Sequence, residues 1–345
     1  MLSDLESLFR RREELLVARR ANSERLQLAL HNYAKFQTAP TWHDSSTPEQ
    51  LEPVTTASNY ISILWSPNAL YMAACESNAA HIYHLDSTPE LVASLRLENE
   101  DDEWPTHVLD DGTLFIRSAK HFSLINGTRR SVFETGCKEY VSSLHHGRWI
   151  SVHAGSTIRV FDCFLECWAD SRYDHTCHVN FFHIDEAGKI DIIQDEHGYV
   201  HSSNLTTSIQ CDSNENLLHC VMLANGMLYL LFYQKPPNHT GRIKALVVNQ
   251  LGMSVWSREC RLDCSFPMIC DNHVVALDGD ARTVLYIELP YLEVATRTRF
   301  ETEGRILGIQ LPARLPRFIS ILIEETQGLA IKVLKRSTLN KHFTL

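Results

Sequence analysis

From Tyr60 onward, short runs of β-branched and aromatic residues recur along the chain, and turn signals separate them. Several of these signals are Asn-Gly or Asp-Gly dipeptides, which suit tight hairpin turns because both positions tolerate positive φ. Comparable units begin near Tyr60, Thr106, Glu139, Val179, Leu217, Met268 and Arg305. They are roughly 35–50 residues long, the length of a four-stranded propeller blade. The recurrence predicts an all-β fold, a seven-bladed β-propeller covering residues 60–345.

Two segments of these units resemble WD40 repeats. Trp65-Ser66-Pro67-Asn68 resembles the turn that leads into a WD40 second strand, and residues 81–86 resemble the third strand after it. Residues 155–162 are similar to the phrase that ends in Trp-Asp, with Phe161 in the place of the tryptophan. Gly-His and Trp-Asp dipeptides are absent from the chain. The resemblance therefore points to a divergent WD40-like propeller, and it implies a rigid platform for protein partners without catalysis.

Residues 1–37 are predicted to form an amphipathic helix, the N-terminal arm. Ser3 and Glu6 have the spacing of a capping box, which satisfies backbone amides at a helix start. An apolar stripe on a helix this long must be covered by something. Either it packs on the rest of this chain, or it forms a coiled coil with itself or a helical partner. The stripe residues assigned to partner binding are Leu5, Leu8, Leu15, Leu26 and Tyr33.

Residues 38–59 have the composition of a linker, with three prolines among Thr, Ser and acidic residues. Within them, Val54–Ala57 can form one short strand. The sequence does not say whether this strand closes the propeller; if it supplies the outer strand of the last blade, it covers a sheet edge that would otherwise expose unpaired amides and carbonyls.

The composition of the 345-residue chain is that of a globular protein: 44% hydrophobic residues with a net charge of −10. The net charge argues against a nucleic-acid coat, and no apolar run is long enough to cross a membrane. The N-terminus lacks the charge-then-apolar order of a secretory signal. We therefore expect an intracellular protein, nuclear or cytoplasmic, whose ten cysteines are free thiols.

The sequence carries no common signature of catalysis or phosphate binding. Neither a Walker A motif, a nucleophile elbow nor a His-Glu-x-x-His motif occurs. Two loose clusters contain metal-ligating residue types, but their spacing differs from that of zinc knuckles, so we interpret these cysteines as small buried hydrophobes. The clusters are Cys163, Cys167, His175, Cys177 and His178, and Cys260, Cys264 and Cys270. The sequence predicts no catalytic residue, metal or cofactor, and a structural role for the 18 histidines.

Two charged segments are candidate partner contacts. The first is an acidic segment that includes Glu100, Asp101 and Asp102 and ends at Trp104. The second is the basic C-terminal region, represented by Lys335 and Arg336. The function that follows is a non-enzymatic scaffold or adaptor subunit of a multiprotein complex, contacting partners through the propeller and the helix. The alternatives are a chromatin- or nucleic-acid-associated adaptor that uses the basic blade, and a propeller enzyme with a loop-built site.

Overall fold

The structure is a computed structural model, and it describes most of the chain after residue 50. The described residues are 24, 26–30, 51–57, 62–85, 89–97, 104–136, 140–154, 157–174, 179–212, 214–223, 226–234, 241–260, 262–270, 273–299, 304–310, 318–325 and 328–336.

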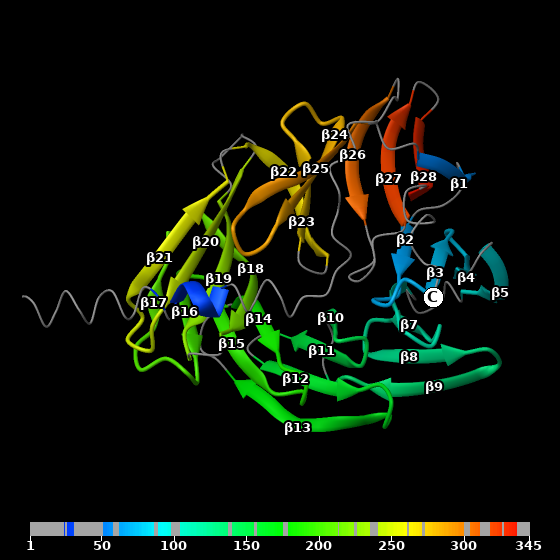
Figure 1. The fold of residues 1–345 in the computed structure, drawn as a ribbon. Coiled ribbons are helices and arrows are strands. Elements are labelled where there is room, and N and C mark those ends of the chain that lie inside the picture. The colour runs from blue at the N-terminus through cyan, green and yellow to red at the C-terminus, as the bar shows by residue number, and fades with distance from the viewer. Residues whose placement is uncertain are drawn as a thin grey trace, which may run out of the picture.

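Their strands pair into seven four-stranded antiparallel sheets arranged in a ring, so the predicted all-β propeller is confirmed (Figure 1). Three sheets contain β2 (Ser62–Trp65), β3 (Tyr71–Cys75), β4 (Ala79–Leu85) and β5 (Pro89–Arg96); β6 (Trp104–Val108), β7 (Leu114–Arg117), β8 (His121–Asn126) and β9 (Arg129–Glu134); and β10 (Val141–His145), β11 (Trp149–Ala154), β12 (Thr157–Asp162) and β13 (Cys167–Asp174). The next three contain β14 (Val179–Ile184), β15 (Ile190–Asp195), β16 (Tyr199–Ser202) and β17 (Ile209–Gln210); β18 (Glu215–Met222), β19 (Leu228–Gln234), β20 (Arg242–Val248) and β21 (Ser254–Glu259); and β22 (Cys264–Cys270), β23 (His273–Asp278), β24 (Thr283–Glu288) and β25 (Glu293–Arg299).

The remaining sheet joins the first strand of the chain to its last three strands. It contains β26 (Arg305–Gln310), β27 (Phe318–Glu325), β28 (Gly328–Arg336) and, at its edge, β1 (Leu51–Ala57). The backbone of β1 pairs antiparallel with β28, from Leu51 opposite Arg336 to Ala57 opposite Ile331. The strand expected at Val54–Ala57 is thus part of a longer strand in the position that closure requires.

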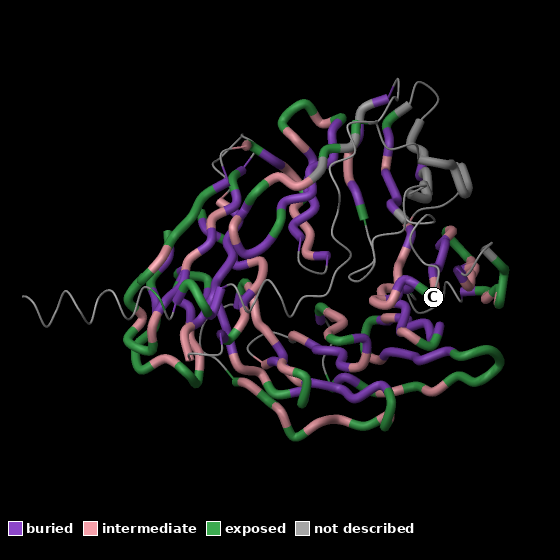
Figure 2. Tube along the Cα trace, viewed as in Figure 1, coloured by how far each residue is buried: buried purple, intermediate pink, exposed green. Residues whose placement is uncertain are grey.

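The first strand of a sheet lies on the inner side of the ring, and none of the described residues of the outer strands β5, β9, β13, β21 and β25 is buried. First strands of neighbouring sheets contact one another, as β2 and β6 do, and β14 and β18. Figure 2 shows the burial concentrated on the middle of the sheets. In the sheet of β18–β21, six of the seven β19 residues are buried, whereas five of the six β21 residues are exposed. Apolar side chains from adjacent sheets fill the space between them, and this burial stabilises the ring.

The first WD40-like segment forms a turn that ties two neighbouring sheets together. The Ser66 hydroxyl accepts a hydrogen bond from the Tyr71 amide at 2.9 Å and donates one to the Asn68 side chain at 2.7 Å. The Asn68 amide in turn donates to Asp110 Oδ1 of the next sheet at 2.8 Å. The polar side chains of Ser66 and Asn68 thus have a structural role within an otherwise apolar repeat. They satisfy backbone amides of the turn and link two sheets.

The second segment ends at Asp162, which is almost fully buried. Its carboxylate accepts hydrogen bonds from the backbone amides of Phe164 and Leu165. It also accepts one from Arg148 Nε, at a distance of 3.0 Å. Hydrogen bonds to the Arg148 side chain and to the two amides outweigh burial and lower the pKa of Asp162. Arg148 also lies 4.5 Å from the centre of the Trp149 ring, a cation–π distance.

Of the predicted N-terminal helix, the structure describes only residues 24 and 26–30, and these are helical. The expectation of one helix over residues 1–37 is corrected to a short helix within the described chain, and the rest of the stripe lies outside the described residues. Leu26, Ala29 and Leu30 are buried in the cluster between the β18–β21 and β22–β25 sheets, while Leu28 is 60% exposed. The described turn of the arm therefore packs on its own propeller.

No helix among the described residues is long and apolar enough to cross a membrane.

Candidate functional site

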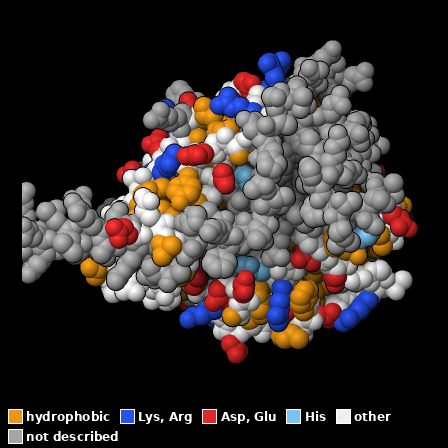
Figure 3. All heavy atoms as spheres, in the orientation of Figure 1, with side chains coloured by type: hydrophobic (Ala, Val, Ile, Leu, Met, Phe, Trp, Pro, Cys, Tyr) orange, Lys and Arg blue, Asp and Glu red, His pale blue; other side chains and the backbone are white. Residues whose placement is uncertain are grey.

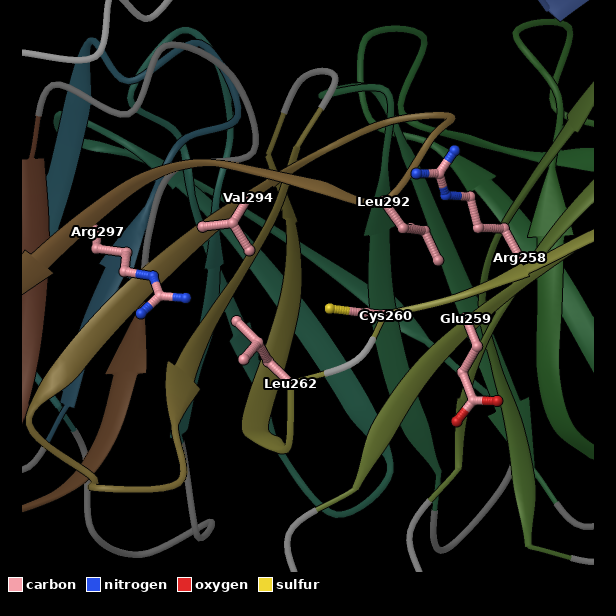
Figure 4. A pocket seen from close by; sticks show the side chains of 7 residues that line it. All are labelled: Arg258, Glu259, Cys260, Leu262, Leu292, Val294 and Arg297. Atoms are coloured by element: carbon pink, nitrogen blue, oxygen red, sulfur yellow. The ribbon is translucent and has the colours of Figure 1, made fainter.

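A groove lies between the outer strands of two neighbouring sheets, at the junction where the helix packs. We call it the β21–β25 groove; its volume is about 480 Å³. Its lining residues are Arg258, Glu259, Cys260, Leu262, Leu292, Val294 and Arg297. Figure 4 shows their side chains, with Leu262, Cys260, Leu292 and Val294 around the middle and charged groups on either side.

The floor of this groove is part of the cluster that holds the helix. Cys260 and Leu292 are buried members of that cluster, and Leu262 and Val294 pack against it while remaining partly accessible. Burial raises the pKa of the Cys260 thiol, so this cysteine is a small apolar group and not a reactive thiolate. The groove is therefore an apolar strip continuous with a surface that already binds an amphipathic helix.

The charged side chains at its rim differ in their partners. Arg258 Nη2 lies 3.0 Å from Glu293 Oε1, and Glu259 Oε1 lies 3.4 Å from Arg242 Nη1. Arg297 has no ion pair with any residue of the described chain. Its guanidinium extends toward the groove beside Val294 and Leu262 (Figure 4). One positive charge at the edge of the apolar strip is therefore not neutralised within the described structure.

A second feature is an arc of histidines on four consecutive inner strands: His107 of β6, His145 of β10, His183 of β14 and His219 of β18. Nε2 of His107 lies 3.2 Å from Ser142 Oγ of the next sheet. The ring of His145 lies 5.6 Å from the ring of Phe182, again on the next sheet. These histidines therefore contribute to the packing of successive inner strands.

Burial disfavours the charged form of three of them. It lowers the pKa of His107 to about 4 and that of His219 to about 4. For His145, burial together with repulsion from His183, His146 and His107 lowers the pKa to about 3. Nδ1 of His183 lies 2.8 Å from an oxygen of Asp191. His107, His145 and His219 are thus neutral at pH 7 and resist protonation, as expected for histidines that support packing.

A third cluster joins residues of one sheet through side-chain hydrogen bonds. His201 Nε2 lies 3.0 Å from Asp195 Oδ2, and its Nδ1 lies 2.8 Å from the Ser208 hydroxyl. The other Asp195 oxygen accepts hydrogen bonds from the amides of His197 and Tyr199. The sequence alone did not indicate this hydrogen-bonded chain of Ser208, His201 and Asp195, because the spacing of the three residues matches no known motif. It fixes the β15–β16 turn and the segment that leads into β17.

Of the residues predicted to contact partners, those that the structure describes lie on different elements. Leu26 is buried against the propeller, and Trp104 begins β6 with 39% of its surface exposed. The backbones of Lys335 and Arg336 pair with Glu52 and Leu51 at the end of β28. The others, Leu5, Leu8, Leu15, Tyr33, Glu100, Asp101 and Asp102, lie outside the described residues.

The candidate metal clusters are not assembled within the described chain. Cys163 is buried and Cys167 is exposed, and residues 175–178 lie outside the described part. Cys260, Cys264 and Cys270 are buried free thiols. No group of three or more potential metal ligands occurs among the residues that the structure describes.

Comparison with known proteins identifies the fold. Raptor from Chaetomium thermophilum superposes with a TM-score of 0.55 and 10% identity, over 84% of this chain and 30% of that one. The C-terminal WD40 domain of Sif2 superposes with a TM-score of 0.50 and 10% identity, over 84% of this chain and 99% of that domain. This chain thus spans less than a third of the Raptor chain.

No protein-family model matches the sequence, and no curated protein matches it. The structural likeness, at 10% identity, shows the fold alone. The chain therefore has a β-propeller fold similar to that of WD40 domains, the fold that its two WD40-like segments indicated.

Proposed function

We propose that this protein is a non-enzymatic scaffold subunit that holds protein partners on its propeller and its N-terminal helix. The observation that carries the proposal is the packing of the helix: Leu26, Ala29 and Leu30 are buried members of a hydrophobic cluster that includes residues of two sheets. Burial of a leucine contributes roughly 1.5–3 kcal/mol, so this part of the arm is held on the ring. The proposal assigns the remaining apolar positions of the stripe, which the sequence predicts, to the binding of a partner helix.

The surface is consistent with a platform for proteins. On the face in Figure 3, hydrophobic side chains are interspersed with acidic and basic ones, and no single sign of charge dominates the described atoms. Such mixed surfaces suit protein contacts better than the phosphate backbone of a nucleic acid, which requires clustered Lys and Arg. On this face, the described atoms therefore do not favour the chromatin or nucleic-acid hypothesis.

The arm can be tested with the full-length protein. Tagged wild type and the Leu8→Asp/Leu15→Asp double variant are recovered from native cells, and the proteins that co-purify are identified. Ala21→Asp, on the polar face of the predicted helix, is the matched control. We expect the double variant to lose a stoichiometric partner that wild type and control both retain, with the melting temperature unchanged.

Other results would contradict the proposal. Retention of every partner by the double variant would show that the stripe does not bind them. A large fall in its melting temperature would show that the stripe belongs to the propeller's own core. Recovery of nucleic acid that declines steeply with salt would favour the chromatin-associated adaptor, and substrate turnover by the purified chain would favour the enzyme.

A further inference from the structure

We infer that the β21–β25 groove binds an extended segment of a partner protein, with an acidic side chain facing Arg297 and apolar side chains on either side of it. The inference rests on the proposed scaffold function, but it concerns the groove and not the arm. Peptide binding and arm-dependent complex recovery can therefore fail independently of each other.

The first argument is the shape and composition of the groove. A volume of about 480 Å³ accommodates a few side chains, within the usual range for ligand sites. Leu262 and Val294 are partly accessible on a floor whose deeper members, Cys260 and Leu292, are buried. Covering this apolar strip with apolar side chains would remove it from water, which favours binding.

The second argument is the charge at its edge. Arg258 and Arg242 near the groove each have carboxylate partners, at 3.0 Å and 2.9 Å. Arg297 has none within the described chain, and it extends toward the apolar strip (Figure 4). A guanidinium can bind a carboxylate through two parallel hydrogen bonds, and this interaction strengthens when the partner's apolar side chains exclude water. The complementary ligand is therefore acidic and apolar together.

The third argument is continuity with an established contact. Leu26, Ala29 and Leu30 of the helix occupy the same inter-sheet cluster that forms the groove floor. The junction of these two sheets thus already binds one amphipathic segment of polypeptide through leucines. A partner segment in the groove would extend this packing along the same junction.

The test uses the full chain and two synthetic peptides with blocked termini, Gly-Leu-Glu-Leu-Gly and Gly-Leu-Gln-Leu-Gly. Binding is followed by NMR of the labelled methyl groups of Leu262, Leu292 and Val294. We expect the glutamate peptide to shift these methyl signals in a saturable manner and the glutamine peptide to bind at least tenfold more weakly. Arg297→Gln should lower the affinity for the glutamate peptide by a similar factor.

Arg282→Gln is the matched control, because Arg282 is an exposed arginine of the turn between β23 and β24 in the same sheet. This control should bind the glutamate peptide as wild type does, and equal melting temperatures establish that both variants fold. Equal affinity of the two peptides, or unchanged affinity in Arg297→Gln, would overturn the inference. So would the absence of any shift, including the case in which nuclear Overhauser contacts show another segment of this chain in the groove.

Discussion

Acid should destabilise this propeller well above the pH at which its carboxylates titrate, because of the histidine arc. His107, His145 and His219 have pKa values of about 4, 3 and 4 in the folded protein. In the unfolded chain their pKa is about 6.5. The unfolded state therefore binds more protons as the pH falls below 6.5, and stability declines until the folded pKa values are reached.

The size of the effect follows from the proton linkage. Between pH 7.5 and pH 5.5, each such histidine raises the unfolding constant about tenfold, which is about 1.4 kcal/mol. Three independent groups would together lower the free energy of unfolding by about 4 kcal/mol, against a typical total of about 5–15 kcal/mol. Asp162, Asp195 and Asp280 have lowered pKa values, so the stability that they contribute is lost only at lower pH.

Denaturant unfolding at pH 7.5 and pH 5.5 measures this loss. The variant His145→Gln removes one titrating group, so its loss of free energy over this interval should fall by about a third. His197→Gln is the control, because the side chain of His197 is 66% exposed, and its loss should equal that of wild type. If His145→Gln shows the same pH dependence as wild type, the arc does not set the acid sensitivity and the reasoning is refuted.

Three further predictions concern the packing of the ring. Leu30→Ala should lower the free energy of unfolding by about 2–3 kcal/mol, because Leu30 is 2% exposed, whereas Leu28→Ala, at a position 60% exposed, should change it by less than about 0.5 kcal/mol. Deletion of β1 (Leu51–Ala57) should cause aggregation, detected by size-exclusion chromatography, because β28 would become an unpaired edge; a monomeric deletion protein would contradict this closure. Gly188→Ala should cost more stability than Gly136→Ala in thermal unfolding: both glycines have positive φ, but a Cβ at Gly188 would lie 2.8 Å from the Trp149 ring, while one at Gly136 meets no atom within 4 Å. Equal losses would show that the turn moves freely away from the indole.

The turn residues show how much the sequence alone can predict. In the turns at Ala187-Gly188 and His197-Gly198, the glycine takes the positive φ, +82° in both cases. Asp278-Gly279 is an exception: Ala281 takes the positive φ instead, because Asp280 accepts hydrogen bonds from the next amides and bends the turn there. The residue types of a short segment thus predict that a turn exists more reliably than they predict which residue of the turn takes the positive φ.

The function-related features depend on contacts between distant parts of the chain. His107, His145, His183 and His219 form an arc only because the inner strands of four sheets lie side by side in the ring. The β21–β25 groove likewise combines residues from two sheets, such as Cys260 with Leu292. No local pattern marks these residues, because their spacing along the chain reflects the lengths of loops and not a motif.

The sequence by itself determined the class of fold. Alternating apolar strands and turn residues at a repeated spacing have few ways to bury their apolar faces, and a ring of four-stranded sheets is one that also removes open edges. Only the tertiary structure decided where Leu26 and Leu30 of the predicted apolar stripe pack. The helical periodicity predicts that Leu26 and Leu30 are buried. It does not predict whether a surface of the same chain or a partner helix buries them, because both remove these side chains from water equally. The cluster between two sheets provides the cover within this chain, because it lies close enough for these leucines to be buried without a second molecule.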